Sequence, residues 1–219
     1  MKITALTDLH GKSGIIPRFG PLLKEADLVI LTGDNTHFGH YDDMQAIIQA
    51  VRQFNNTVYA VSGNCDYPDG EQYLVETGIN INACMKEFQG IHFAGISGSL
   101  PCPGTTPHEY SEEEFGITLD SMTAEIRYPF ILVTHQPPFH TKNDRVAFGI
   151  HVGSKVIRRF IGDFSPLVCF TGHIHEGKGI DMVNKTKVVN PGPAKEGYYA
   201  SLIVEDGIIR ELRIDRVKG

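Results

Sequence analysis

Short apolar runs recur along the chain, and each of them ends abruptly in polar residues. The runs cover residues 3–7, 28–32, 58–62, 130–134 and 166–170. Runs of this length that are rich in β-branched residues predict strands buried on both faces. The carboxyl ends of such strands lie at one edge of an open α/β sheet, where ligands bind. We therefore expect the polar residues after these runs to meet at one rim.

Helical and hairpin patterns lie between and after the apolar runs. We expect helices at about 17–26, from Asp42 or Asp43 to Phe54, at 72–77, from the capping box of Ser111 and Glu114 towards Ile126, and at 154–161. We expect paired strands within 79–96 around a turn at 89–90, strands near 179–183 and 187–189, and a hairpin of 198–205 with 208–214. This order predicts an α/β fold of two packed mixed sheets flanked by helices. No internal repeat or linker interrupts it, so we predict a single domain over residues 1–219.

Composition and charge narrow the range of functions. The chain has 219 residues and a net charge of -6, which is enough length for one domain with a large core. No run rich in Lys and Arg offsets the charge, which argues against a general nucleic-acid binder but leaves a short or modified oligonucleotide open. No apolar stretch approaches the ~20 residues of a membrane span, and the N-terminus enters a strand at once. We therefore expect a cytoplasmic protein without membrane association.

The four cysteines give no evidence of a structural framework. Cys65, Cys84, Cys102 and Cys169 show no C-x-x-C spacing, which argues against disulfide bonds and a structural zinc site. We interpret Cys84, Cys102 and Cys169 as core or loop residues.

The polar residues at the strand ends are metal ligands by type. They are Asp8, His10, Asp34, Asn64, His135, His173 and His175. Carboxylate, amide and imidazole donors suit Mn²⁺, Fe²⁺, Zn²⁺ or Ni²⁺, with Mn²⁺ as our first expectation. Seven side chains exceed the three or four of one catalytic zinc, so we predict two divalent ions. A carboxylate between two like-charged ions is needed to hold them roughly 3.5–4 Å apart, as in two-metal hydrolases. We expect Asp34 to be this carboxylate, because it follows the middle strand.

Two simpler interpretations compete with this site. Gly11-Lys12-Ser13 has the ending of a P-loop, but Leu6 occupies the position of that motif's first glycine, so we reject it. An isolated His-x-His sequence, here His173 and His175, is more often a pair of surface or hydrogen-bonded histidines. The ligands at the other strand ends favour the metal site.

The motifs resemble those of the calcineurin-like metallophosphoesterases. The resemblance rests on Asp8-x-His10, Gly33-Asp34, Gly63-Asn64-Cys65-Asp66, His135 and Gly172-His173-x-His175, in the order of the family. It implies a four-layer α/β/β/α sandwich and a dinuclear centre. It also implies that Asp8, His10, Asp34 and His175 hold one ion and that Asp34, Asn64, His135 and His173 hold the other. The implied reaction is in-line attack on phosphorus by a hydroxide that bridges the ions.

Cys65 departs from the pattern of many members, which carry a histidine there. That histidine contacts the substrate phosphate or protonates the leaving oxygen, whereas a thiol that titrates near ~8.5 supplies no cation at pH 7. Gly-Asn-Cys-Asp resembles a prokaryotic phosphodiesterase branch. We therefore predict a phosphodiesterase that acts best on activated aryl diesters and more weakly on alkyl phosphomonoesters.

Roles in catalysis or binding are predicted for several further residues. The predicted catalytic set is Asp34, Asn64, Cys65, Asp66 and His135, where Asp66 either orients a histidine or caps a turn. His140, Arg145 and His151 are candidates for binding the second substituent of a diester. We interpret His37, His40, Lys155, Arg158 and Arg159 as solvated surface residues.

Two other functions stay open at this point. A metal-dependent nuclease of the same fold would need a basic groove, which the acidic balance disfavours. A non-catalytic interaction scaffold would have a degraded metal site, as in the retromer subunit of this fold family, whereas every ligand position is filled here. We expect a small phosphoester as the substrate, and the sequence leaves open whether the chain forms a homo-oligomer.

Overall fold

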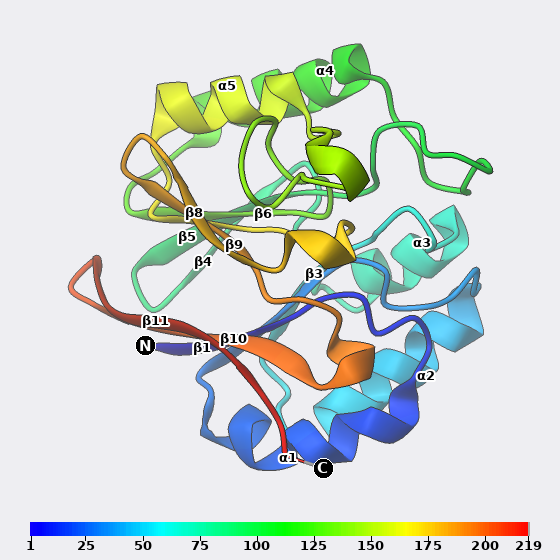
Figure 1. The fold of residues 1–219 in the computed structure, drawn as a ribbon. Coiled ribbons are helices and arrows are strands. Elements are labelled where there is room, and N and C mark those ends of the chain that lie inside the picture. Colours follow the sequence, from blue (N-terminus) through cyan, green and yellow to red (C-terminus); the bar gives the residue numbers. More distant parts are fainter. Residues whose placement is uncertain (219) are drawn as a thin grey trace.

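Two β-sheets packed face to face form the centre of the protein, and helices cover both outer faces (Figure 1). The computed structural model describes residues 1–218. In spatial order, the first sheet contains β11 (Ile208–Arg216), β10 (Tyr198–Glu205), β1 (Lys2–Leu6), β2 (Leu28–Thr32) and β3 (Val58–Val61). The second sheet contains β4 (Met85–Phe88), β5 (Ile91–Ile96), β6 (Phe130–Thr134), β7 (Val168–Phe170), β9 (Thr186–Asn190) and β8 (Gly179–Val183).

The outer layers are formed by five α-helices. The helices α1 (Ile16–Glu25), α2 (Tyr41–Arg52) and α3 (Pro68–Glu76) lie on the first sheet, and α4 (Glu112–Met122) and α5 (Lys155–Phe164) lie on the second. Short 3-10 helices are η1 (Ser13–Ile15), η2 (Thr123–Glu125), η3 (Ala147–Gly149), η4 (His175–Gly177) and η5 (Ala194–Glu196). The expected α/β fold of two mixed sheets flanked by helices is confirmed.

The apolar runs become strands because both of their faces are buried. Along β2, Val29 and Leu31 pack towards the helices, while Leu28 and Ile30 pack between the two sheets. In β6 the same alternation sends Ile131 to the sheet interface and Leu132 towards α4 and α5. Strand residues alternate between faces, so a strand that is covered on both sides reads as an unbroken apolar run.

Parallel pairing brings the strand ends to one side of the sandwich. β1, β2 and β3 run parallel to one another, and β5, β6, β7 and β9 do the same in the second sheet. Antiparallel pairing joins β4 to β5, β8 to β9, β1 to β10 and β10 to β11. The polar residues after β1, β2, β3, β6 and β7 therefore lie close together.

Two helix starts differ from the sequence expectation. α2 begins after His40, and Asp43 does not cap it directly but accepts a hydrogen bond from the His40 backbone N–H at 2.9 Å. α3 begins at Pro68 instead of residue 72, because proline has the backbone angle of a first helical residue and no N–H to satisfy. The capping box of Ser111 and Glu114 and the turn at Gln89 and Gly90 are confirmed.

Two backbone hydrogen bonds join the beginning and the end of the loop between β6 and α5. Phe139 N donates to Ser154 O at 2.9 Å, and Ser154 N donates to Pro137 O at 2.9 Å. The Ser154 hydroxyl accepts from Ile157 N as the cap of α5 and donates to Glu112 of α4 at 2.6 Å. Ser154 thus connects the loop to both helices of this layer.

Within residues 1–218, no helix is long and apolar enough to cross a membrane.

Replacement of Ser154 by alanine should lower the free energy of unfolding by about 1–2 kcal/mol, because the cap and its link to α4 are both lost. Urea denaturation measures this change. The control is Ser121→Ala, which removes an exposed serine of α4 and should change stability by less than about 0.5 kcal/mol. Equal effects of the two substitutions would contradict the role given to Ser154.

Candidate metal centre

Five strand ends supply the side chains of the predicted metal centre. Asp8 and His10 follow β1, Asp34 follows β2, Asn64 follows β3, His135 follows β6, and His173 and His175 follow β7. Contacts between these side chains cross from one sheet to the other. The structure therefore brings all seven predicted ligands to one rim.

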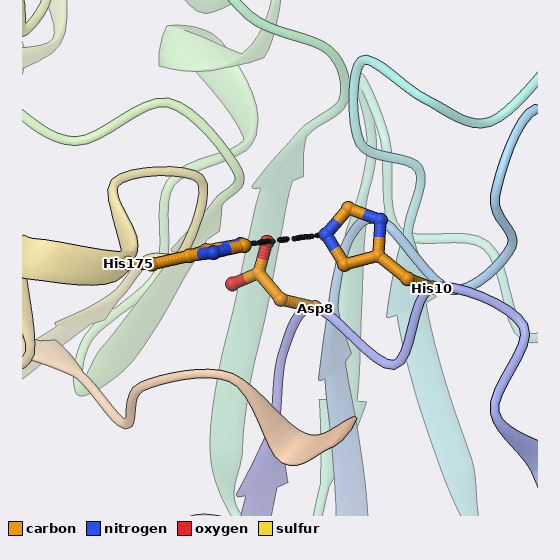
Figure 2. A group of neighbouring side chains, drawn as sticks. All are labelled: Asp8, His10 and His175. Carbon is orange, nitrogen blue, oxygen red and sulfur yellow. Dashed lines mark hydrogen bonds and ion pairs between the residues drawn. The ribbon is translucent and has the colours of Figure 1, made fainter. Parts of the chain in front are cut away.

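Asp8, His10 and His175 form the first cluster (Figure 2). The Nε2 atoms of His10 and His175 are 3.3 Å apart and face one another beside the Asp8 carboxylate. Asp8 Oδ1 lies 3.4 Å from His175 Nε2 and 3.8 Å from His10 Nε2. Three donor atoms thus converge on one small volume.

The second cluster forms around His135. Its Nε2 lies 3.0 Å from Asn64 Oδ1 and 3.3 Å from Asp34 Oδ1. The His173 ring lies beside it, with the ring centroids 5.2 Å apart. Asp34 joins the two clusters, because its other oxygen, Oδ2, is 3.6 Å from His10 Nε2. Asp34 therefore faces both clusters, each with a different oxygen, and a carboxylate oxygen of Asp8 also lies within 4.8 Å of ligand atoms of Asp34 and His135.

The environment of the Asp8 carboxylate indicates that these residues can hold a divalent cation. Both of its carboxylate oxygens are buried and accept no hydrogen bond from the residues that the structure describes, and His10 Nδ1 is likewise unpartnered. A buried carboxylate that accepts no hydrogen bond is costly, whereas a bound cation satisfies it. The mixed oxygen and nitrogen donors suit a borderline divalent metal.

The electrostatics of the rim keep two ligands in their binding form. Burial lowers the pKa of His10 and of His173 to about 4, so both rings are neutral at pH 7. Burial opposes ionisation of Asp34, but the charge and hydrogen bond of His135 outweigh it, and the Asp34 pKa lies well below its usual range. Although burial favours neutral His135, the Asp34 charge raises the His135 pKa to about 9. The negative charge that keeps His135 protonated also attracts a metal cation.

The backbone at this rim is unusual. Asp8, His10, Asp34 and His173 have positive φ angles of 54°, 45°, 49° and 66°. Residues with side chains rarely adopt this left-handed conformation, and such residues gather at functional sites. Neighbouring strand ends hold it in place, since Asp8 N donates to Gly33 O at 3.1 Å and His10 N donates to Asp34 O at 2.8 Å.

Two glycines allow the clusters to pack this closely. A Cβ atom at Gly63 would overlap the backbone nitrogen and Oδ1 of Asp34, and one at Gly33 would overlap the His135 ring. The glycine before Asp34 and the glycine before Asn64 are therefore steric requirements of the site.

Backbone carbonyls and Asn190 orient the histidines. His135 Nδ1 is hydrogen-bonded to Thr32 O at 2.8 Å, which directs Nε2 towards Asp34 and Asn64. Asn190 Nδ2 donates to Ile174 O at 2.8 Å and to Gly172 O at 3.3 Å, and thereby fixes the turn that carries His173 and His175. The role of Asn190 was not predicted, although the signal was visible in Asn190-Pro191-Gly192-Pro193, a rigid turn after a strand.

Asp66 acts on the loops and not on a histidine. Its carboxylate accepts hydrogen bonds from Thr36 N and Oγ1, each at 2.7 Å, from Gly63 N at 2.8 Å, and from Asn35. Its carboxylate pairs with no histidine within residues 1–218, so the prediction that Asp66 orients a histidine is wrong and the turn-capping alternative holds. Burial raises the pKa of Asp66 to about 6.

Two cysteines lie at the rim. Cys65 Sγ lies within 4.8 Å of ligand atoms of His10 and Asp34, and Cys65 N donates to Asp34 Oδ1 at 2.8 Å. Burial and the nearby Asp34 charge raise the pKa of Cys65, so its thiol is neutral at pH 7. Cys102 Sγ lies 3.6 Å from His173 Nε2, a contact between distant segments that the sequence interpretation of Cys102 did not include.

Thr106 and Glu109 orient Asn64. Asn64 Nδ2 donates to Thr106 Oγ1 at 3.2 Å, and Thr106 Oγ1 donates to Glu109 Oε1 at 2.6 Å. The amide nitrogen is thereby held away from His135, and the amide oxygen faces it. These two residues come from loop 97–110, in which the sequence contains no recognisable motif.

The basic residues around the rim behave differently from one another. His37 and His40 are exposed, as expected. Lys155 and Arg159 are also exposed, whereas Arg158 is half-buried and donates to Phe139 O and His140 O. Lys195 was not predicted near this site, but its backbone N donates to Asp8 O at 3.3 Å, and after burial its positive charge also contributes to the lowered pKa of His10.

Comparisons with known proteins agree with the geometry. The sequence profile of the family described as calcineurin-like phosphoesterase matches residues 1–177. An uncharacterized protein of Methanocaldococcus jannaschii is 39% identical over 205 residues, which cover 91% of each chain. The crystal structure of a Thermus thermophilus protein is similar with a TM-score of 0.80 at 21% identity, over 99% of both chains. A structure described as a novel archaeal phosphodiesterase has a TM-score of 0.52 at 16% identity, also over 99% of both chains.

Thr106→Ala should weaken Mn²⁺ binding by about tenfold or more, because Asn64 loses the partner that fixes its amide. Thr106→Ser should restore most of the affinity, since it keeps the hydroxyl. Calorimetric titration with Mn²⁺ measures both variants. Thr105→Ala, at an exposed neighbour, is the control and should leave the affinity within about twofold. An unchanged affinity in Thr106→Ala would remove Thr106 from the site.

Proposed function

The chain belongs to the calcineurin-like phosphoesterase family, and from that premise we propose that it hydrolyses a small phosphodiester with two divalent metal ions. The observation that carries the proposal is the position of Asp34. Its Oδ2 faces His10 and its Oδ1 faces His135, which is the arrangement that a carboxylate shared by two ions requires. The filled set of ligands argues against a non-catalytic scaffold.

We assign the ligands to the two ions as the family resemblance implies. Asp8, His10, Asp34 and His175 would hold one ion, and Asp34, Asn64, His135 and His173 would hold the other. When bound, such a pair supplies an ionised water and Lewis-acid stabilisation of phosphoryl charge. We propose Mn²⁺ as the ion in use, since oxygen and imidazole donors without thiolate accept it readily.

The preference for a diester rests on Cys65. A neutral thiol at this position neither attracts phosphate as a cation nor donates a proton as readily as a protonated imidazole. Substrates whose leaving group departs as a stabilised anion need no such proton. The archaeal phosphodiesterase with a similar fold supports the diester, although a putative 5'-nucleotidase of Staphylococcus aureus also shares the fold, with a TM-score of 0.64.

Removal of metal should abolish hydrolysis of bis(4-nitrophenyl) phosphate, and added Mn²⁺ should restore it with two ions bound per chain. Asp34→Asn should lower kcat by about 10³-fold or more, because the shared carboxylate loses its charge. Steady-state kinetics and metal analysis by mass spectrometry measure these changes. Asp42→Asn, at the exposed start of α2, is the control. Activity that survives chelation would contradict the proposal.

Cys65→His should raise the turnover of diesters with alkyl leaving groups by about 10²-fold, because the ring supplies the missing proton. The rate for activated aryl diesters should change by much less. Cys84→His, at a half-buried thiol of another loop, is the matched control. If Cys65→His slows the alkyl substrates instead, the account of Cys65 fails.

A further inference from the structure

A cavity of about 390 Å³ lies directly beside His173. Two loops form its walls. Loop 97–110 contributes Leu100, Pro101 and Pro103, and loop 136–153 contributes Val146 and Val152. The volume falls within the ~300–1,000 Å³ of small-molecule sites. We call this cavity the apolar subsite.

We infer that the apolar subsite binds an apolar, aryl-sized ester group of the phosphoester held at the metal centre. The inference rests on the proposed function, because it assigns the substituent of the same substrate. The connection between subsite and centre is His173, which lines the cavity and also packs against His135. A phosphoryl group at the metal centre would place one ester substituent next to this wall.

The polar groups of the lining are already occupied. Gln136 accepts a hydrogen bond from Leu100 N at 3.0 Å and donates to Val152 O at 2.9 Å, so its amide joins the two loops. The Cys102 thiol is hydrogen-bonded to Leu100 O at 3.3 Å. A substituent with hydroxyl groups would lose its bonds to water here without gaining partners, whereas an apolar ring gains burial.

The fold of loop 136–153 explains why the subsite lacks charge. Arg145 and His151 pair as an antiparallel bridge and line a separate depression of about 180 Å³, together with His140. Their neighbours Val146 and Val152 line the apolar subsite instead. Successive residues of paired strands point to opposite sides. His140, Arg145 and His151 therefore do not line the cavity beside the metal centre, contrary to the role suggested for them by their position after His135.

The test compares phenylphosphonate with methylphosphonate as ligands of the Mn²⁺-loaded protein by calorimetry, which needs no turnover. The phenyl compound should bind at least about tenfold more tightly, equivalent to ~1.4 kcal/mol. Val146→Phe, which fills the cavity, should reduce this preference to less than about threefold and leave methylphosphonate affinity unchanged. The isosteric double variant Val146→Thr with Val152→Thr should also reduce the preference, and it covers the case in which Val146→Phe disturbs the loop.

The matched control is Ile150→Ser, at an exposed residue of the same loop outside the cavity lining. This variant should prefer phenylphosphonate over methylphosphonate to the same extent as the native chain. If aryl diesters are still hydrolysed, either of two results would overturn the subsite alone. These are equal affinity for the two phosphonates and a preference that persists in both valine variants. If neither phosphonate binds and no diester is hydrolysed, the proposed function fails and the subsite fails with it.

Discussion

The burial of Asp8 and Asp34 is the constraint on which the rest of the site depends. Two ionised carboxylates lie beneath the surface among four imidazole rings, and such charges cost several kcal/mol each unless they are compensated. Asp34 is partly compensated by His135 and by the N–H of Cys65, whereas Asp8 accepts no hydrogen bond from the described residues. A dication removes this penalty. The buried charges therefore destabilise the metal-free fold and favour the binding of metal.

The surrounding structure serves to hold these charges at fixed separations. Left-handed backbone at Asp8 and Asp34 turns the side chains inward from the strand ends, and glycines before the ligands let the two sheets approach. The helices and the three apolar layers supply the packing that maintains such conformations. The polar relay from Glu109 to Asn64 extends this rigidity to a neutral ligand.

Much of this architecture was predictable from the sequence, because strand burial and ligand type are local properties. The unbroken apolar run of residues 28–32 indicated a strand covered on both faces, and Asp34, two residues beyond its end, indicated a ligand. The contacts of Asp66, Cys102 and Thr106 were not predictable, because their partners lie about 30 to 70 residues away and depend on loop paths. The start of α2 was missed because Asp43 acts through the His40 N–H, a geometry that pattern alone does not distinguish.

The clamp formed by Pro137, Phe139 and Ser154 has a consequence for the divergence of such proteins. The loop leaves and re-enters the domain within hydrogen-bonding distance, so its length is decoupled from the registers of β6 and α5. Loops closed in this way tolerate insertion and replacement better than segments that span a core. We therefore expect changes in the length of this segment to leave the positions of β6 and α5 unaltered.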